Sequence, residues 1–320
     1  MKASSTITTN PASVGECGPQ ASGEGLLALE PHGHGVRVRV GAYIELTKPG
    51  ITRLVAMTSA AGFYMGSQGG IHWIRLLHTL IGVLLAAAGA NALNEYAEAD
   101  LDGRMRRTRL RPLPSRRIGR RGALLFALAM SLVGACYLLI AVNAATAVLV
   151  SASILCYVLI YTPLKRRTTL ATLVGAIPGA LPVLAGWAAS DAPLNAAAWS
   201  LFWILFLWQI PHFLALAWMH REDYRRGGYA MLSVFDPDGR STSRQAMLYA
   251  IALLPVSLLP SVLGLTGAIY FFGAFALGLG FVALAAAMVL DRSTDRARRL
   301  FLASVVYLPL LLVLLVVNKV

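Results

Sequence analysis

The sequence predicts an all-α membrane protein that crosses the bilayer many times. Of its 320 residues, 57% are hydrophobic and only 13% are charged, and the mean hydropathy is +0.64. Ordinary soluble domains are about 45–50% apolar and about 25% charged. Apolar runs of bilayer length recur along the chain, and almost all basic residues fall in alternate loops between them. Together these observations exclude a soluble globular enzyme.

Nine apolar runs are each long enough to cross a bilayer, which takes about 20 residues of helix. The third and fourth runs meet at Asn143, and the seventh and eighth meet near Gly267, so each pair is expected to form a tight helical hairpin. We therefore expect nine transmembrane helices, arranged as two pseudo-repeated four-helix units plus one further helix. The runs lie near residues 46–66, 72–95, 122–141, 144–162, 170–189, 197–218, 246–266, 269–290 and 300–317.

The basic residues predict the orientation, because short cytoplasmic loops collect Lys and Arg. With a cytoplasmic N-terminus, the N-terminal segment and the even-numbered loops hold 25 of the 28 Lys and Arg residues. The opposite face keeps only Arg75 and Lys319, and Arg53 lies near the inner end of the first run. We expect a multi-pass membrane protein in which this basic face is cytoplasmic. The net charge of +13 then follows from topology, and no nucleic-acid partner is expected.

The N-terminal residues 1–42 differ in composition from the rest of the chain. They are rich in Ser, Thr, Gly and Pro and show no periodic apolar pattern, so we expect a disordered cytoplasmic tail before a transmembrane domain at 43–320. The three cysteines, Cys17, Cys136 and Cys156, form no C-x-x-C pair. Neither a disulfide framework nor a structural zinc site is implied.

The loop after the second run carries acids, which do little for orientation and need another explanation. Asn94, Glu98 and Asp102 recur every four residues, so they share one face if the helix continues that far. Their oxygens are hard ligands of the kind that bind Mg²⁺ and leave positions for a substrate phosphate. Spacing alone leaves two interpretations: a metal and diphosphate site, or a solvated helix end whose acids pair with arginines. The arginines that follow, with guanidinium groups suited to phosphate, are Arg104, Arg106, Arg107, Arg109 and Arg111.

The loop after the sixth run holds Glu222 and Asp223. Four spans separate it from the first acidic loop, and an even number of spans puts both loops on one membrane face. Asp223 is therefore a candidate ligand facing the first motif. His212 lies inside the preceding span beside Pro211, where an ionisable side chain is costly and marks a functional position. A hydrogen-bonded core histidine is the alternative.

Several other residues between and within the apolar runs have two interpretations each. Lys165 and Arg166 follow the fourth span on the same face, where they serve either orientation or phosphate binding. Gly175 and Gly179 form a small-xxx-small pair that is typical of helix packing. Aromatic residues of the sixth span either line a pocket or pack in the core: Trp203, Phe206, Trp208, Phe213 and Trp218.

Four motifs, in order, carry a family resemblance: N-x-x-x-E-x-x-x-D with RMRRTRLRPLP, then YTPLKR, WQIPHFLALAW and REDYRRGGYAML. Together they resemble the UbiA-type intramembrane prenyltransferases, and more narrowly the branch that farnesylates heme, from about Glu45 to the C-terminus. The resemblance implies a UbiA-like fold and two Mg²⁺-diphosphate motifs. Glu98 departs from the commoner Asp, and His212 takes the place of the earlier acid of the second motif. The implied metal-binding and catalytic residues are Asn94, Glu98, Asp102 and Asp223.

The same resemblance implies the substrates. A farnesyl group would pass from farnesyl diphosphate to a vinyl group of heme b within the lipid bilayer, with addition of water. His212 and Tyr224 would contact substrate, since a histidine can bind heme iron or a propionate. The protein would also contact a downstream heme A synthase or the proteins that assemble a terminal oxidase. The residues implied for the diphosphate are Arg104, Arg107, Arg111, Lys165 and Arg166.

Two other functions are compatible with parts of the sequence. One is a related transferase that acts on an aromatic acid or a quinone precursor, against which the WQIPHF motif with His212 argues. The other is a transporter or a heme-binding membrane protein without catalysis. Transporters place charged residues near the bilayer midplane, whereas nearly all acids of this chain lie at one face.

Overall fold

The computed structural model describes residues 36–320, which form helices joined by loops, with one isolated antiparallel bridge between Thr266 and Lys319. Most of the segment expected as a tail, residues 1–35, lies outside the described residues. Helix α1 (Val36–Leu46) begins within the range expected as tail, so the helical part starts earlier than residue 43. The all-α fold class is confirmed for the described part of the chain.

All nine apolar runs form long helices. Eight helical segments are long and apolar enough to cross a membrane, and α2 is a ninth long helix that is less apolar because it includes Arg53 and several Gly and Thr residues. The helices are α2 (Pro49–Gly66), α3 (Trp73–Asp102), α4 (Arg120–Ala141), α5 (Ala144–Leu155) continued by the π-helix η1 (Cys156–Tyr161) and α6 (Thr162–Leu164), α7 (Ala171–Ala189), α8 (Ala196–Met219), α11 (Arg240–Val262), α12 (Ala268–Leu290) and α13 (Thr294–Val317). Two short helices, α9 (Arg221–Gly227) and α10 (Leu232–Phe235), lie between α8 and α11.

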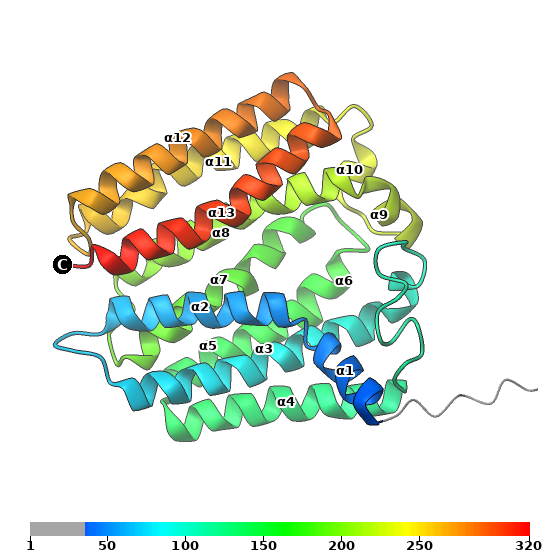
Figure 1. The fold of residues 1–320 in the computed structure, drawn as a ribbon, viewed down its shortest axis with the longest axis horizontal. Helices are drawn as coiled ribbons and strands as arrows, with labels where there is room; N and C mark the ends of the chain where they lie inside the picture. The colour runs from blue at the N-terminus through cyan, green and yellow to red at the C-terminus, as the bar shows by residue number, and fades with distance from the viewer. Residues whose placement is uncertain (1–35) are drawn as a thin grey trace, which may run out of the picture. The chain divides into compact units, whose positions relative to one another are not determined.

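The described helices pack in two groups that meet along α2 and α7 (Figure 1). Helices α8, α11, α12 and α13 form one group, and α3, α4 and α5 form the other. Glycines allow α2 and α7 to approach closely, because a Cβ at Gly62 would overlap the carbonyl of Val183 and one at Gly186 would overlap the carbonyl of Ser59. Small residues are the usual means of close helix packing in membranes, where lipid gives no hydrophobic drive for association.

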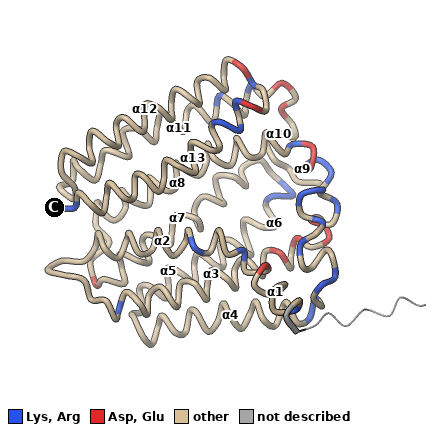
Figure 2. Tube along the Cα trace, in the orientation of Figure 1, with Lys and Arg blue, Asp and Glu red and all other residues tan. Residues whose placement is uncertain are grey.

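Charged residues gather at one end of the helix bundle (Figure 2). This end includes α1, the loop after α3, and α9. At the opposite end, Arg75 pairs with Asp191, and the Lys319 ammonium donates to the carbonyl oxygen of Tyr64 at 2.7 Å. The structure thus confirms that the two acid-bearing loops share one end. The compartment that this end faces stays a prediction.

Candidate active site

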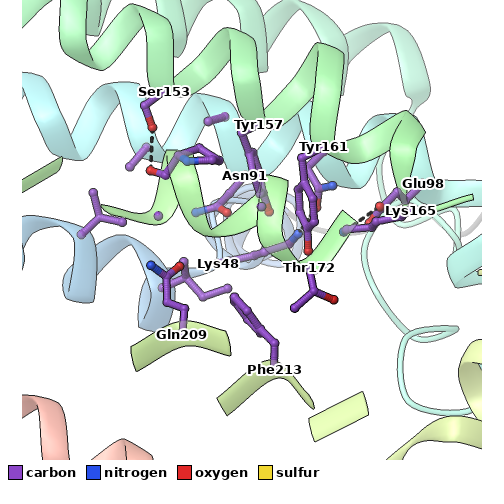
Figure 3. A pocket seen from close by; sticks show the side chains of 18 of the residues that line it. Lys48, Asn91, Glu98, Ser153, Tyr157, Tyr161, Lys165, Thr172, Gln209 and Phe213 are labelled. Atoms are coloured by element: carbon purple, nitrogen blue, oxygen red, sulfur yellow. Dashed lines mark hydrogen bonds and ion pairs between the residues drawn. The ribbon is translucent and has the colours of Figure 1, made fainter. Parts of the chain in front are cut away.

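A cavity of about 280 Å³ opens between the two groups of helices, with walls from α2, α3, α5, η1, α7 and α8 (Figure 3). Its two ends differ sharply in chemistry. The apolar end includes Val83, Val150, Pro178 and Pro182. The charged end consists of Lys48, Asn94, Glu98, Asp102, Arg107, Arg111 and Lys165.

The acidic motif lies on one face of α3, because that helix continues without a break to Asp102. Asn94, Glu98 and Asp102 are all buried and all line the cavity. Each has a basic partner at hydrogen-bond distance. The pairs are Lys48 Nζ to Asn94 Oδ1 at 2.7 Å, Lys165 Nζ to Glu98 Oε1 at 2.8 Å, and Arg111 Nη1 to Asp102 Oδ2 at 2.6 Å. The alternative of a solvated helix end does not describe this arrangement, since the carboxylates are inside the protein.

Lys48 also lies at the charged end, although its position in the sequence indicated only one more basic residue of the N-terminal segment. It precedes Pro49 at the start of α2 and has a left-handed backbone conformation with φ of 50°. Such a conformation is strained for a residue with a side chain and persists where the surrounding structure holds it. Burial, followed by the charge of Arg111, holds the pKa of Lys48 below its ordinary value. The left-handed turn between α1 and α2 places the Lys48 ammonium group against the acidic motif.

Lys165 is enclosed by aromatic rings as well as by Glu98. Its ammonium lies 4.4 Å from the ring centroid of Tyr161, which stacks on Tyr157 with centroids 5.5 Å apart. Burial lowers the pKa of Lys165, but the Glu98 carboxylate and the surrounding tyrosines raise it more, and the net pKa is well above the ordinary value. The pair with Glu98 therefore favours the protonated form of Lys165.

The second acidic loop folds back over the first. The carboxylate of Asp223, on α9, accepts a hydrogen bond from the backbone N–H of Arg106 at 3.3 Å. Tyr224 and Tyr229 line the cavity beside it. Asp223 itself is not among the residues that line the cavity.

The structure brings only some of the expected phosphate-binding residues to the cavity. Arg107 and Arg111, from the loop after α3, line it together with Lys165. Arg104 and Arg166 are exposed and lie outside the cavity wall. Arg107 is also exposed, so it differs from Arg104 and Arg166 in lining the cavity and not in its exposure.

His212, expected to contact substrate, is not among the residues that line the cavity. Its Nδ1 lies 2.7 Å from Ser304 Oγ on α13, and its ring packs against Trp208 and Phe301. The cavity is lined instead by Gln209 and Phe213. Successive residues of an α-helix are about 100° apart, so the residue before Phe213 points to a different neighbour. These contacts match the other interpretation of His212, a hydrogen-bonded histidine in the protein core.

Of the five aromatic residues singled out on α8, Phe213 alone lines the cavity, while Trp208 and Trp218 are buried in the core. Their ring N–H groups donate to backbone carbonyls, from Trp208 to Ser304 and from Trp218 to Arg292, each at 2.8 Å. Most of this aromatic run therefore packs the bundle.

The motif fits a hard cation by its chemistry. Within residues 36–320 no cluster of three or more His, Cys, Asp or Glu side chains has metal-binding geometry. However, Glu98 and Asp102 each use one carboxylate oxygen in an ion pair, and no hydrogen bond among the described residues occupies Glu98 Oε2 or Asp102 Oδ1. An amide and two carboxylates that keep free oxygens suit Mg²⁺, which takes few protein ligands and shares the rest with phosphate.

The cavity, with its charged end and apolar interior, suits an amphipathic molecule with a polar head. The chain belongs to the UbiA prenyltransferase family, whose model matches residues 55–309. It is therefore a multi-pass membrane prenyltransferase.

Its curated relatives are named protoheme IX farnesyltransferase. The protein of Solibacter usitatus is 46% identical and aligns over 87% of this chain and 98% of its own length. The protein of Salinibacter ruber is 45% identical over 86% of this chain and 98% of its own length. The mitochondrial protein of Arabidopsis thaliana is 38% identical and covers 87% of this chain and 65% of its own.

Solved structures show the same fold at low identity. A digeranylgeranylglyceryl phosphate synthase superposes with a TM-score of 0.74 at 17% identity, covering 88% of this chain and 98% of its own. A UbiA homologue from Archaeoglobus fulgidus bound to GPP and Mg²⁺ gives a TM-score of 0.64 at 15% identity, covering 86% of this chain and 99% of its own. The UbiA-like fold class is thus confirmed.

Proposed function

We propose that this enzyme transfers the farnesyl group of farnesyl diphosphate to a vinyl group of heme b, with addition of water, and releases diphosphate. The relatives named protoheme IX farnesyltransferase align over nearly their whole length in the bacterial cases and support this assignment. The product is the hydroxyethylfarnesyl heme known as heme O.

The main support for the proposal is that one end of the cavity is charged and the rest of its wall is apolar. Four basic residues, Lys48, Arg107, Arg111 and Lys165, converge on the acidic face of α3 at one end. Charge-assisted hydrogen bonds from such groups suit a diphosphate. The rest of the wall is largely apolar, as an isoprenoid chain and a porphyrin require.

Mg²⁺ is the metal that this donor set suits, and the A. fulgidus homologue was solved with it. We assign Asn94, Glu98 and Asp102 as its protein ligands, and Asp223 of α9, which accepts a hydrogen bond from the backbone of Arg106, as a further candidate ligand. When bound, the ion would act as a Lewis acid on the diphosphate. Lys48, Lys165 and Arg111, now paired with the motif, are placed to turn to the phosphate oxygens.

The chain's own residues supply the remaining catalysis. Cationic side chains at the charged end stabilise the negative charge that grows on the departing diphosphate. The stacked rings of Tyr157 and Tyr161 line the cavity and would offer aromatic faces to an allylic cation, a contact worth about 2 kcal/mol when water is excluded. The apolar wall keeps bulk water from the reactive carbon.

We also propose that the charged end faces the cytoplasm in a bacterial inner membrane and that the N-terminus is cytoplasmic. The excess of basic residues at this end supports the orientation. A protease site inserted before α1 should be cut from the cytoplasmic side only. Heme O made in the membrane would be handed to a heme A synthase or to oxidase assembly, which crosslinking in native membranes would test.

The experiment that tests the function uses membranes containing the full chain. Supplied with heme b, farnesyl diphosphate and Mg²⁺, they should form a heme product whose mass has increased by one farnesyl group and one water molecule. The parallel reaction replaces heme b with an aromatic acid or a quinone precursor. Prenylation of the aromatic acceptor with heme b untouched would refute the assignment and favour the related transferase.

A further inference from the structure

Thr162 is a buried residue that contacts the acidic motif without being among the residues that line the cavity. Its Oγ1 lies 3.1 Å from Asn94 Nδ2 and 2.8 Å from the carbonyl oxygen of Tyr157. At the other end of the Asn94 carboxamide, Lys48 Nζ lies 2.7 Å from Oδ1. Asn94 is thus held between a hydroxyl group and an ammonium group.

The chemistry of these two partners determines which way the Asn94 carboxamide points. An ammonium group can only donate, so the atom that meets Lys48 is the carboxamide oxygen. A hydroxyl group has one proton, and that of Thr162 goes to the Tyr157 carbonyl, which can only accept. Thr162 Oγ1 is left as an acceptor, and the group that it accepts from is the carboxamide NH₂. Both partners therefore require the same orientation.

The π-helix η1 fixes the position of Thr162. The backbone N–H and the side-chain hydroxyl of Thr162 both donate to the carbonyl oxygen of Tyr157, five residues earlier. Pro163 follows, and it has no N–H with which to continue the helical ladder. Short π-helical turns inside α-helices are often found at functional sites. The acceptor for Asn94 is therefore held by two hydrogen bonds to one carbonyl.

An asparagine binds a hard cation through its oxygen, because its NH₂ group is a donor. We propose that Thr162 is a positioning residue that keeps the Asn94 oxygen, and not the NH₂ group, available to the cation. Lys48 imposes the same orientation, but it is one of the side chains placed to turn to the phosphate oxygens. Once Lys48 does so, Thr162 is the partner that remains. This inference rests on the assignment of Asn94 as a Mg²⁺ ligand in the proposed function.

The test measures metal binding by the purified full-length protein in micelles. Mn²⁺ alone is the probe, because it takes the same oxygen ligands as Mg²⁺ and its free form is counted by electron paramagnetic resonance. Thr162→Val keeps the shape of the side chain and removes its acceptor. Losing a hydrogen bond that orients a metal ligand typically weakens binding by about 10-fold or more, which is the effect expected here. Thr162→Ser keeps the hydroxyl and should bind Mn²⁺ like wild type.

Thr146→Val is the matched control. Thr146 is a buried threonine at the start of α5, and its hydroxyl donates to the carbonyl oxygen of Ala185 at 3.2 Å. The substitution removes the same hydroxyl group without touching the acidic motif. Mn²⁺ affinity should therefore be unchanged.

Asn94→Asp separates orientation from stability. A carboxylate presents an oxygen at either end, so it needs no partner to set its orientation. In the Asn94→Asp background, Thr162→Val should leave Mn²⁺ binding unchanged. A purely structural role of Thr162 would instead weaken binding by the same factor in both backgrounds.

Wild-type Mn²⁺ affinity in Thr162→Val would overturn the inference. An equal loss in Thr162→Ser, in Thr146→Val or in the Asn94→Asp background would also overturn it. If Thr162→Val does not fold, Thr162→Cys takes its place with the same expectations, since a thiol is a weak acceptor.

Asn94→Ala tests the proposed function itself. Wild type and Asn94→Ala that bind Mn²⁺ equally would show that Asn94 is not a ligand, and the metal assignment would fail. Weak binding by Asn94→Ala beside an unaffected Thr162→Val would refute only the positioning role. The two failures are therefore distinguishable.

Discussion

The Glu98–Lys165 pair offers a quantitative test of how the charged end is built. Its atoms are 2.8 Å apart, and the side chains are 6% and 12% exposed. The perturbation is a double-mutant cycle with Glu98→Gln, Lys165→Met and the double variant. Each single change leaves one charge buried without its partner, whereas the double change removes both charges.

The geometry sets the expected size of the coupling. At an effective dielectric constant of about 20, two unit charges 2.8 Å apart attract by about 6 kcal/mol before desolvation is counted. Removing one partner of a buried pair costs about 3–5 kcal/mol. The double variant should therefore be more stable than the sum of the single effects predicts, by about 3 kcal/mol or more.

A surface pair in the same protein gives the matched control. Arg225 and Glu222 are 2.5 Å apart, but their side chains are 67% and 55% exposed. Exposed pairs couple by about 0.2–1 kcal/mol because water screens them. Both cycles are measured by reversible denaturant unfolding in mixed micelles without substrate. A coupling below about 1 kcal/mol for Glu98 and Lys165, equal to that of the surface pair, would refute the view that these charges are desolvated.

Three further predictions follow from the site and the packing. Asp102→Ala should reduce heme farnesylation by at least about 100-fold, while Asp100→Ala, which removes only an exposed partner of Arg120, should stay close to wild type; equal activities would contradict the assigned ligand. Chelation of divalent cations should stop product formation, and added Mg²⁺ should restore it; turnover that persists in excess chelator would argue against a metal. Gly186→Ala should destabilise the protein by about 1–3 kcal/mol in detergent, because α2 and α7 must separate, whereas Gly280→Ala meets open space and should be neutral or slightly stabilising.

Local sequence was sufficient for the helices and for the acidic motif. Bilayer-length apolar runs predicted the long helices because a helix is the way to satisfy backbone groups in lipid. The fourfold spacing of Asn94, Glu98 and Asp102 predicted one shared face, and α3 continues far enough to produce it. These features depend only on residues close together in the chain.

A helix that is apolar on every side gives no pattern from which to predict which of its residues face the cavity. Helix α8 is hydrophobic around most of its circumference, so periodicity could not tell whether His212 or Gln209 lines the cavity. The sequence favoured His212 because a charge in a membrane is costly, but Ser304 from α13 satisfies that residue. Likewise Gly175 and Gly179 were interpreted as helix packing, whereas they also seat Tyr161 and Gln209 at the cavity.

The sequence by itself determined that this is a polytopic membrane protein with its basic residues in alternate loops and an acidic motif at the end of the second long apolar helix. Only the tertiary structure decided which basic residues meet that motif: Lys48 from before α2, Arg111 from the next loop and Lys165 from beyond α6. The physical reason is that hydrophobicity and spacing act along one helix. Pairing of charges across 9 to 67 residues depends on how the helices rotate and pack against one another.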